Sequence, residues 1–138
     1  MGDRVQRPRR AKVTFREYEV GDVTEVGIET LWPSVEFTLP RGKLWTVLAD
    51  GKPVGFFGCI PHSGYTNVWY EGQPWVQHEI GYLRKCRDVM RDLHAQYGPL
   101  YNFVHQPDPK LIKWLRWMGC AVREEGDGTY LLVFDPEQ

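Results

Sequence analysis

The stretch that decides the fold runs from Gln77 to Val122, QHEIGYLRKCRDVMRDLHAQYGPLYNFVHQPDPKLIKWLRWMGCAV. Its first part carries apolar residues at steps of three and four, a spacing that places them along one side of an α-helix. Gly98 and Pro99 end this helix, because glycine favours a helix terminus and proline cannot continue one. The pattern predicts one long helix with a single buried face. That face consists of Ile80, Leu83, Cys86, Met90, Leu93 and Tyr97.

A strand, a short helix and a second strand are predicted in the remainder of this stretch. Residues 100–105 are mostly apolar and predict a strand, which the turn-forming residues at 106–109 terminate. An amphipathic helix follows and stops at Gly119, and residues 120–125 predict the next strand. The apolar face of the short helix consists of Leu111, Leu115 and Met118.

The N-terminal half carries the signals of one helix and several strands. Asp22 follows a turn at Gly21 and is the predicted N-cap of a helix that runs toward Trp32-Pro33. Asp50-Gly51 predicts a β-hairpin, because this pair favours the tight turn that joins antiparallel strands. Residues 61–64 predict a loop. The other predicted strands are residues 13–20, 44–49, 53–60 and 66–71, together with residues 130–134, which close a second hairpin.

Length and charge limit the classes of function. The 138 residues, 42% of them hydrophobic, have the size of one domain. We expect a basic N-terminal arm over residues 1–12 and a single domain over residues 13–138. The formal net charge of -1 provides no overall attraction for nucleic acid, so nucleic-acid binding is the weakest hypothesis. No run approaches the ~20 apolar residues that a membrane span needs, and we expect no membrane partner.

The cysteines argue against an oxidising compartment. Cys59, Cys86 and Cys120 are far apart in the sequence, and each lies in an apolar or helical stretch. We therefore expect reduced, buried thiols in a cytoplasmic protein and neither a disulfide framework nor a metal site. The chain also lacks a Walker loop and a Ser-His-Asp order.

This order of elements resembles the GNAT acetyltransferase superfamily, in which a long helix follows the fourth strand and a fifth strand, a short helix and a terminal hairpin come after it. Residues 54–59, VGFFGC, resemble that family's third strand, where glycine lets strands and ligand approach closely. The resemblance implies an α/β (α+β) fold with a mixed, mostly antiparallel sheet of about six to seven strands flanked by helices. It also implies that strands 4 and 5 form a splayed parallel pair, with acetyl-CoA bound in the gap.

The same resemblance implies that main-chain amides at the start of the long helix hold the cofactor's diphosphate, since free amides and the helix dipole favour anions. The family's loop pattern, Gln/Arg-x-x-Gly-x-Gly/Ala, is altered here, because Gln77 is followed by glycine only at Gly81, one position late. Glu79 adds a negative charge, which Arg84 and Lys85 offset. The expected cofactor-binding residues are Val68, Trp69, Tyr70, Gln77, His78, Ile80, Gly81, Tyr82, Arg84 and Lys85.

Catalysis in this family also implies an acid and a base. The acid is in many members a tyrosine four residues before the glycine that closes the short helix, and the residue at that position here is Leu115. For the base that deprotonates the acceptor amine, Glu71 is the first candidate, and His62 and His105 follow. The simpler explanation of Glu71 is a surface carboxylate at a strand end, and that of His105 is a structural or solvent-facing histidine.

Two functions stay open. The first is an N-acetyltransferase that transfers acetyl from acetyl-CoA to an amine of a protein or small molecule by direct attack. The second is a non-catalytic protein of virion morphogenesis or host interaction, because residues 101–104 and 111–122 resemble GNAT-like internal virion proteins of short-tailed phages. Trp75, Trp114 and Trp117 would then contact a phage or host protein, in the host cytoplasm or the virion.

Overall fold

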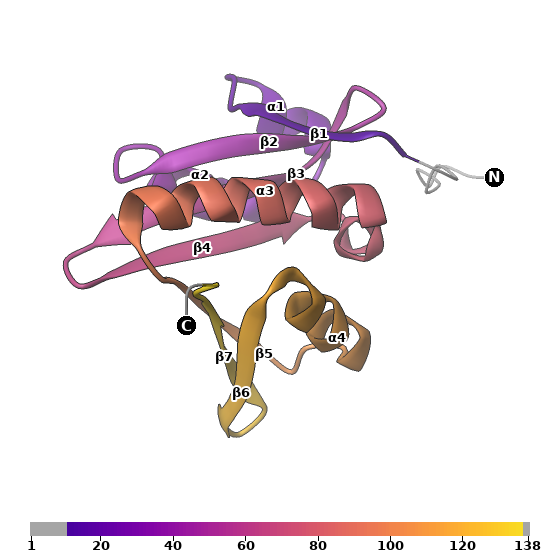
Figure 1. Cartoon of the computed structure of the whole chain (residues 1–138). Coiled ribbons are helices and arrows are strands. Elements are labelled where there is room, and N and C mark those ends of the chain that lie inside the picture. Colours follow the sequence, from indigo (N-terminus) through magenta and orange to yellow (C-terminus); the bar gives the residue numbers. More distant parts are fainter. Residues whose placement is uncertain (1–10, 137–138) are drawn as a thin grey trace.

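The computed structural model describes residues 11–136, which form one seven-stranded sheet in the order β1-β2-β3-β4-β5-β7-β6 (Figure 1). The basic arm expected over residues 1–12 lies, up to residue 10, outside the described residues. The strands are β1 (Val13–Glu17), β2 (Lys43–Ala49), β3 (Lys52–His62), β4 (Tyr65–Gly72), β5 (Leu100–His105), β6 (Cys120–Gly126) and β7 (Thr129–Phe134). The helices are α1 (Asp22–Val26), η1 (Glu29–Leu31), α2 (Trp32–Thr38), η2 (Pro74–His78), α3 (Ile80–Tyr97) and α4 (Pro109–Met118).

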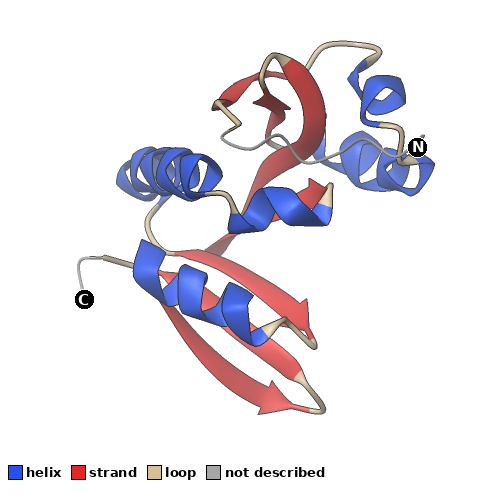
Figure 2. Ribbon diagram, turned by 90° about the vertical axis from the view of Figure 1, so that its right-hand side faces the viewer, coloured by secondary structure: helices blue, strands red, loops and turns tan. Residues whose placement is uncertain are grey.

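Helices cover both faces of the sheet. Figure 2 shows α3 and the α1–α2 pair on opposite sides, with α4 against the C-terminal strands. Phe56 and Phe57 are neighbours on β3 and point to opposite faces, since successive strand residues alternate. Phe57 joins the large apolar cluster under α3 and α4, and Phe56 joins the smaller cluster under α1 and α2. This two-sided burial explains why β3 is an almost continuous apolar run.

The long helix predicted from the apolar spacing is confirmed as α3, and Gly98 ends it with φ +83°. Leu83, Cys86, Met90 and Leu93 are buried as expected. Ile80, the first residue of the helix, is 45% exposed, so this position of the predicted apolar face is not buried. Tyr82 occupies the buried position at this end, where its ring lies near Tyr70 and Phe15.

The predicted single helix after Asp22 is wrong. The chain forms α1, which ends at Gly27 with φ +78°, and then α2, which carries Pro33 in its first turn. Proline lacks a backbone N–H and is tolerated in a first helical turn, so Pro33 marks a beginning and not an end. The loop predicted at residues 61–64 is shorter than expected, because β3 continues through His62 and Gly64 makes the turn with φ +91°.

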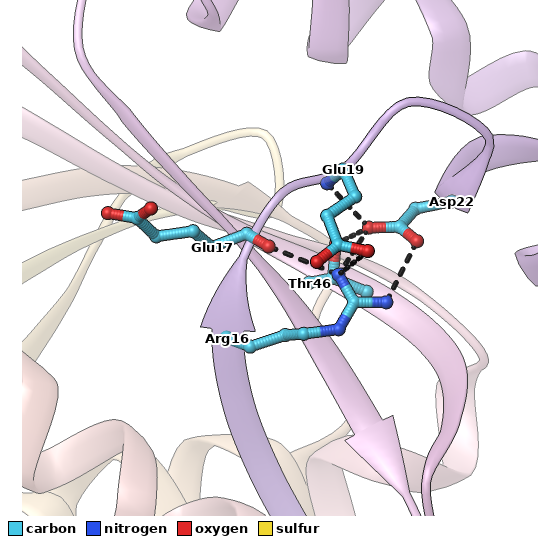
Figure 3. Close-up of polar contacts among 5 residues, drawn as sticks. All are labelled: Arg16, Glu17, Glu19, Asp22 and Thr46. Atoms are coloured by element: carbon cyan, nitrogen blue, oxygen red, sulfur yellow. Dashed lines mark hydrogen bonds and ion pairs between the residues drawn. The ribbon is translucent and has the colours of Figure 1, made fainter.

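The sequence predicted Asp22 as the N-cap of this helix, and that prediction is wrong. The N-cap of α1 is Gly21. The buried Asp22 carboxylate instead accepts hydrogen bonds from two Arg16 guanidinium nitrogens at 2.8 and 3.0 Å, from the Glu19 amide at 2.8 Å and from the Thr46 hydroxyl (Figure 3). Burial alone would raise the pKa of Asp22, but these hydrogen bonds outweigh it and lower the pKa. These hydrogen bonds of Asp22 connect α1 to β1 and β2.

Strands β4 and β5 are the parallel pair of the sheet. Their register within residues 11–136 consists of Thr66 with Leu100 and Asn67 with Tyr101. Figure 1 shows the two strands diverging beyond this point. The mixed sheet with a splayed β4–β5 pair is therefore confirmed.

Two further findings concern the described residues 11–136. None of their helices is both long enough and apolar enough to cross a bilayer. All three cysteines of the chain lie in this range, and each is a buried free thiol.

Candidate functional site

The divergence of β4 and β5 opens a cavity of about 100 Å³ that faces solvent. Its walls come from both strands, from α3 and from α4, and are mostly apolar. The peptide groups of residues 68–72 and 102–105 that face this opening cannot pair across it, so they are available to solvent or to a ligand. The residues that line it include Val68, Trp69, Tyr70, Gln77, Tyr82, Leu83, Cys86, Met90, Leu100, Asn102, Val104, Leu111 and Leu115.

Two asparagines close the narrow end of the opening. The Asn67 side-chain amide donates to the Tyr101 carbonyl at 3.2 Å, across the point where the backbone ladder stops. The Asn102 side-chain oxygen accepts from the Phe103 amide at 2.8 Å. These side chains satisfy main-chain groups that would otherwise lack a partner, and they stabilise the separation of the strands.

Tyr70 and Trp69 fill the space above two glycines of β3. A Cβ at Gly55 would lie 2.5 Å from the Tyr70 hydroxyl oxygen, and a Cβ at Gly58 would lie 2.3 Å from the Trp69 ring. The Tyr70 hydroxyl donates to the Gln73 carbonyl at 3.1 Å, and burial raises its pKa. Gly55 and Gly58 therefore make room for aromatic rings of the neighbouring strand.

The start of α3 lies beside the cavity, since Gln77, just before the helix, and Tyr82, in its first turn, both line it. The amides of residues 80–82 have no partner within the helix, as in any first helical turn. The helix η2 occupies the place of the glycine-rich loop that the resemblance implied. Glu79 is buried at the N-cap of α3.

The remaining predicted cofactor residues lie around this helix start. Arg84 and Lys85 are exposed on the first turns of α3. The His78 side chain points toward α4, where its Nε2 is 3.9 Å from an Asp108 carboxylate oxygen. Among the residues that the structure describes, the buried Nδ1 of His78 has no hydrogen-bond partner.

The three candidate bases are not brought together. Glu71 lies at the end of β4 in a groove on the α2 face, where its carboxylate accepts from the Ser34 hydroxyl at 2.9 Å. His62 ends β3, opposite Tyr65 at the start of β4, and its ring stacks on Tyr65 at 4.6 Å. His105 ends β5 beyond the divergence, and its Nδ1 lies 3.2 Å from the Thr129 hydroxyl. Of the three, Glu71 lines the groove on the α2 face.

The groove around Glu71 has a volume of about 350 Å³ and lies between α2 and the outer faces of β3 and β4. Sequence reasoning missed Ser34, because the helix α2 that carries it was not predicted. Pro33 could have indicated this helix, because proline is typical of a first helical turn, and Ser34 is the next residue. The lining consists of Pro33, Ser34, Phe37, Thr38, Ile60, Asn67, Trp69 and Glu71.

The thiols at the cavity are unreactive. Burial raises the pKa of Cys86 and of Cys120 to about 12, so both remain protonated at neutral pH. A neutral thiol is a poor nucleophile. The cavity therefore does not favour covalent catalysis through cysteine.

No family model and no curated protein matches the amino-acid sequence of the chain. Several solved structures match its fold. A GNAT family acetyltransferase from Elizabethkingia anophelis with acetyl-CoA bound has a TM-score of 0.65 at 12% identity, over 90% of this chain and 98% of that chain. The chain has the GNAT fold. An acetyltransferase from Bacillus subtilis in complex with CoA has a TM-score of 0.66 at 9% identity, over 91% of this chain and 98% of that chain.

A third match to the GNAT fold is the ribosomal-protein-S18-alanine N-acetyltransferase from Escherichia coli, with a TM-score of 0.64 at 14% identity, over 88% of this chain and 90% of that chain. At these identities the similarity concerns the fold, and one fold supports many functions. The chemistry of this chain therefore depends on its own residues.

Proposed function

We propose that this chain is an N-acyltransferase that transfers an acetyl group from acetyl-CoA to an amine. The observation that carries the proposal is the divergence of β4 and β5 over an apolar cavity with the start of α3 beside it. A groove with a carboxylate lies on the other face of the same strand. One strand thus separates a place for the cofactor from a place for the acceptor.

The residues present fit the parts of the cofactor. The pantetheine arm is narrow and carries amides, and the free peptide groups of β4 and β5 suit such an arm. The diphosphate would bind at the amides of residues 80–82, with Arg84 and Lys85 on the next turn of α3. Gln77 lines the cavity between these two regions. The buried Glu79 opposes the diphosphate charge, so we expect moderate affinity.

In the proposed reaction, bound acetyl-CoA supplies a thioester that the amine attacks directly. Glu71 takes the proton from the amine, because its carboxylate faces the groove and Ser34 holds it there. Leu115 faces the cavity but has no proton to donate, so we propose that water protonates the leaving thiolate. We place the protein in the cytoplasm, where its buried thiols stay reduced.

Isothermal titration with CoA and acetyl-CoA tests the proposal, and we expect saturable heat below about 1 mM ligand. Val104→Trp should weaken CoA binding by about tenfold or more, because the indole would fill the cavity that Val104 lines. Phe103→Trp is the matched control, since Phe103 is 62% exposed on the opposite face of β5. Equal affinities of wild type and Val104→Trp would contradict the assigned site.

Leu115→Tyr is expected to raise the rate of acetyl transfer by about tenfold, because it places a phenol at the cavity where the structure has leucine. Leu115→Phe adds the same ring without the hydroxyl and should not raise the rate. Steady-state kinetics with a fixed amine, followed by thiol release, compares the two variants. A gain in both would show that ring size matters and proton donation does not.

A non-catalytic role in assembly or host interaction is the second candidate. It is favoured by Glu79 at the N-cap of α3 and by the apolar residue at position 115. Trp117 is 41% exposed, and the Arg87 guanidinium lies 4.6 Å from its ring centroid. Trp75 and Trp114 pack partly against the main core. The similarity to phage proteins stays a prediction, and absence of any CoA heat together with a stable protein partner would favour it.

A further inference from the structure

Trp69 lines both the cavity between β4 and β5 and the groove that contains Glu71. Its neighbours on the strand do not share this property. Val68 and Tyr70 line the cavity, and Glu71 lines the groove. Trp69 therefore borders both spaces, and its side chain lies on the α2 face of β4, the side of the groove.

Several contacts fix the position of the Trp69 ring. The Trp69 indole N–H donates to the Thr38 hydroxyl at 3.1 Å, and that hydroxyl donates to the Ser34 carbonyl at 2.8 Å. The ring lies directly over Gly58, where any Cβ would collide with it. It also packs against the apolar cluster that contains Phe56. A ring held on these sides cannot swing away without breaking packing or hydrogen bonds.

We propose that Trp69 is the specificity-determining residue for the length of the transferred acyl group and restricts it to acetyl. This inference rests on the proposed function. Trp69 and Glu71 lie on the same face of β4, two residues and about 7 Å apart. An acyl group that reaches from the cavity toward an amine at Glu71 therefore contacts the indole. A butyryl group is two methylenes longer and would need the volume that the ring occupies.

The test compares the Kd of CoA, acetyl-CoA and butyryl-CoA by isothermal titration. Wild type should bind acetyl-CoA at least about tenfold more tightly than butyryl-CoA, since a pocket wall discriminates by about this factor for small changes in chain length. Trp69→Leu should abolish that preference, because it joins the cavity to the groove. The Kd of CoA without an acyl group is measured in the same variants, so that a general effect on the cofactor site is separated from a change in acyl preference.

Phe37→Leu is the matched control. It is the same aromatic-to-leucine change in a residue that lines the groove and not the cavity, and it should leave the preference unchanged. Thr38→Val removes the hydrogen bond to the indole and keeps the size of the side chain, so it should reduce the preference partly. Trp69→Phe gives a smaller change in the same direction and replaces Trp69→Leu if that variant does not fold.

The outcomes separate the two proposals. If wild type binds CoA and the acetyl preference is the same in wild type and in the Trp69 variants, the role of Trp69 is wrong and the CoA site stands. If wild type binds butyryl-CoA as tightly as acetyl-CoA, the role of Trp69 is also wrong. If wild type binds none of the three ligands, the proposed function fails and this inference fails with it.

Discussion

Replacing Glu71 by glutamine is expected to lower the rate of acetyl transfer by about 10²-fold or more, while the Kd of acetyl-CoA stays within about twofold of the wild-type value. Glutamine has nearly the same size and still accepts a hydrogen bond from Ser34, but it cannot take a proton. The change therefore removes the base and leaves the groove intact. The effect belongs to the chemical step, because Glu71 does not line the cavity assigned to the cofactor.

Thiol release from acetyl-CoA, with a panel of small amines and lysine peptides as acceptors, measures this rate. Glu36→Gln is the control, since Glu36 is an exposed carboxylate on the same helix as Ser34 and does not line the groove. Ser34→Ala should have a smaller effect of about tenfold or less, because it removes one contact that positions the carboxylate. A Glu71→Gln variant with the wild-type rate would exclude Glu71 as the base.

Asp22→Ala is expected to lower the free energy of unfolding by roughly 2–4 kcal/mol. The change leaves the fully buried Thr46 hydroxyl and the Glu19 amide without their acceptor and removes the charge that pairs with Arg16. Arg16 is 32% exposed, so water compensates part of its loss, and the cost stays at the lower end for a broken buried ion pair. Urea denaturation measures the change. Asp88→Ala, on the exposed face of α3, should shift the free energy by less than about 0.5 kcal/mol.

The same carboxylate gives the stability a dependence on pH with a defined sign. The pKa of Asp22 is lower in the folded protein than in the unfolded chain, where it is about 3.9. Its contribution is therefore fully present above the unfolded pKa and is lost as the pH falls through the folded pKa. Asp22→Asn should show a smaller drop in the urea midpoint between pH 5 and pH 3 than wild type. Parallel curves for the two proteins would mean that Asp22 is not the group responsible.

The amino-acid sequence by itself determined the elements whose signals are local. The spacing of three and four residues in α3, the glycines that end α3 and α4, and Asp50-Gly51 at the β2–β3 turn are all short-range features. They act through backbone sterics and one buried face, so they predict helices and strands without knowledge of the partners. The order of these elements resembles that of the GNAT superfamily, and this resemblance implied the sheet with its splayed parallel pair.

Only the tertiary structure decided which side chains meet. Ser34 and Glu71 are 37 residues apart and form a hydrogen bond because α2 packs on β3, the strand next to β4. Asp22 became a partner of Arg16 and Thr46 instead of a helix cap, since the carboxylate lies buried between two strands. Trp69 borders both the cavity and the groove, and its ring has room because Gly58 lies on the neighbouring strand. These contacts depend on packing between segments that are distant in the sequence. The periodicity of apolar residues along the chain carries no information about that packing.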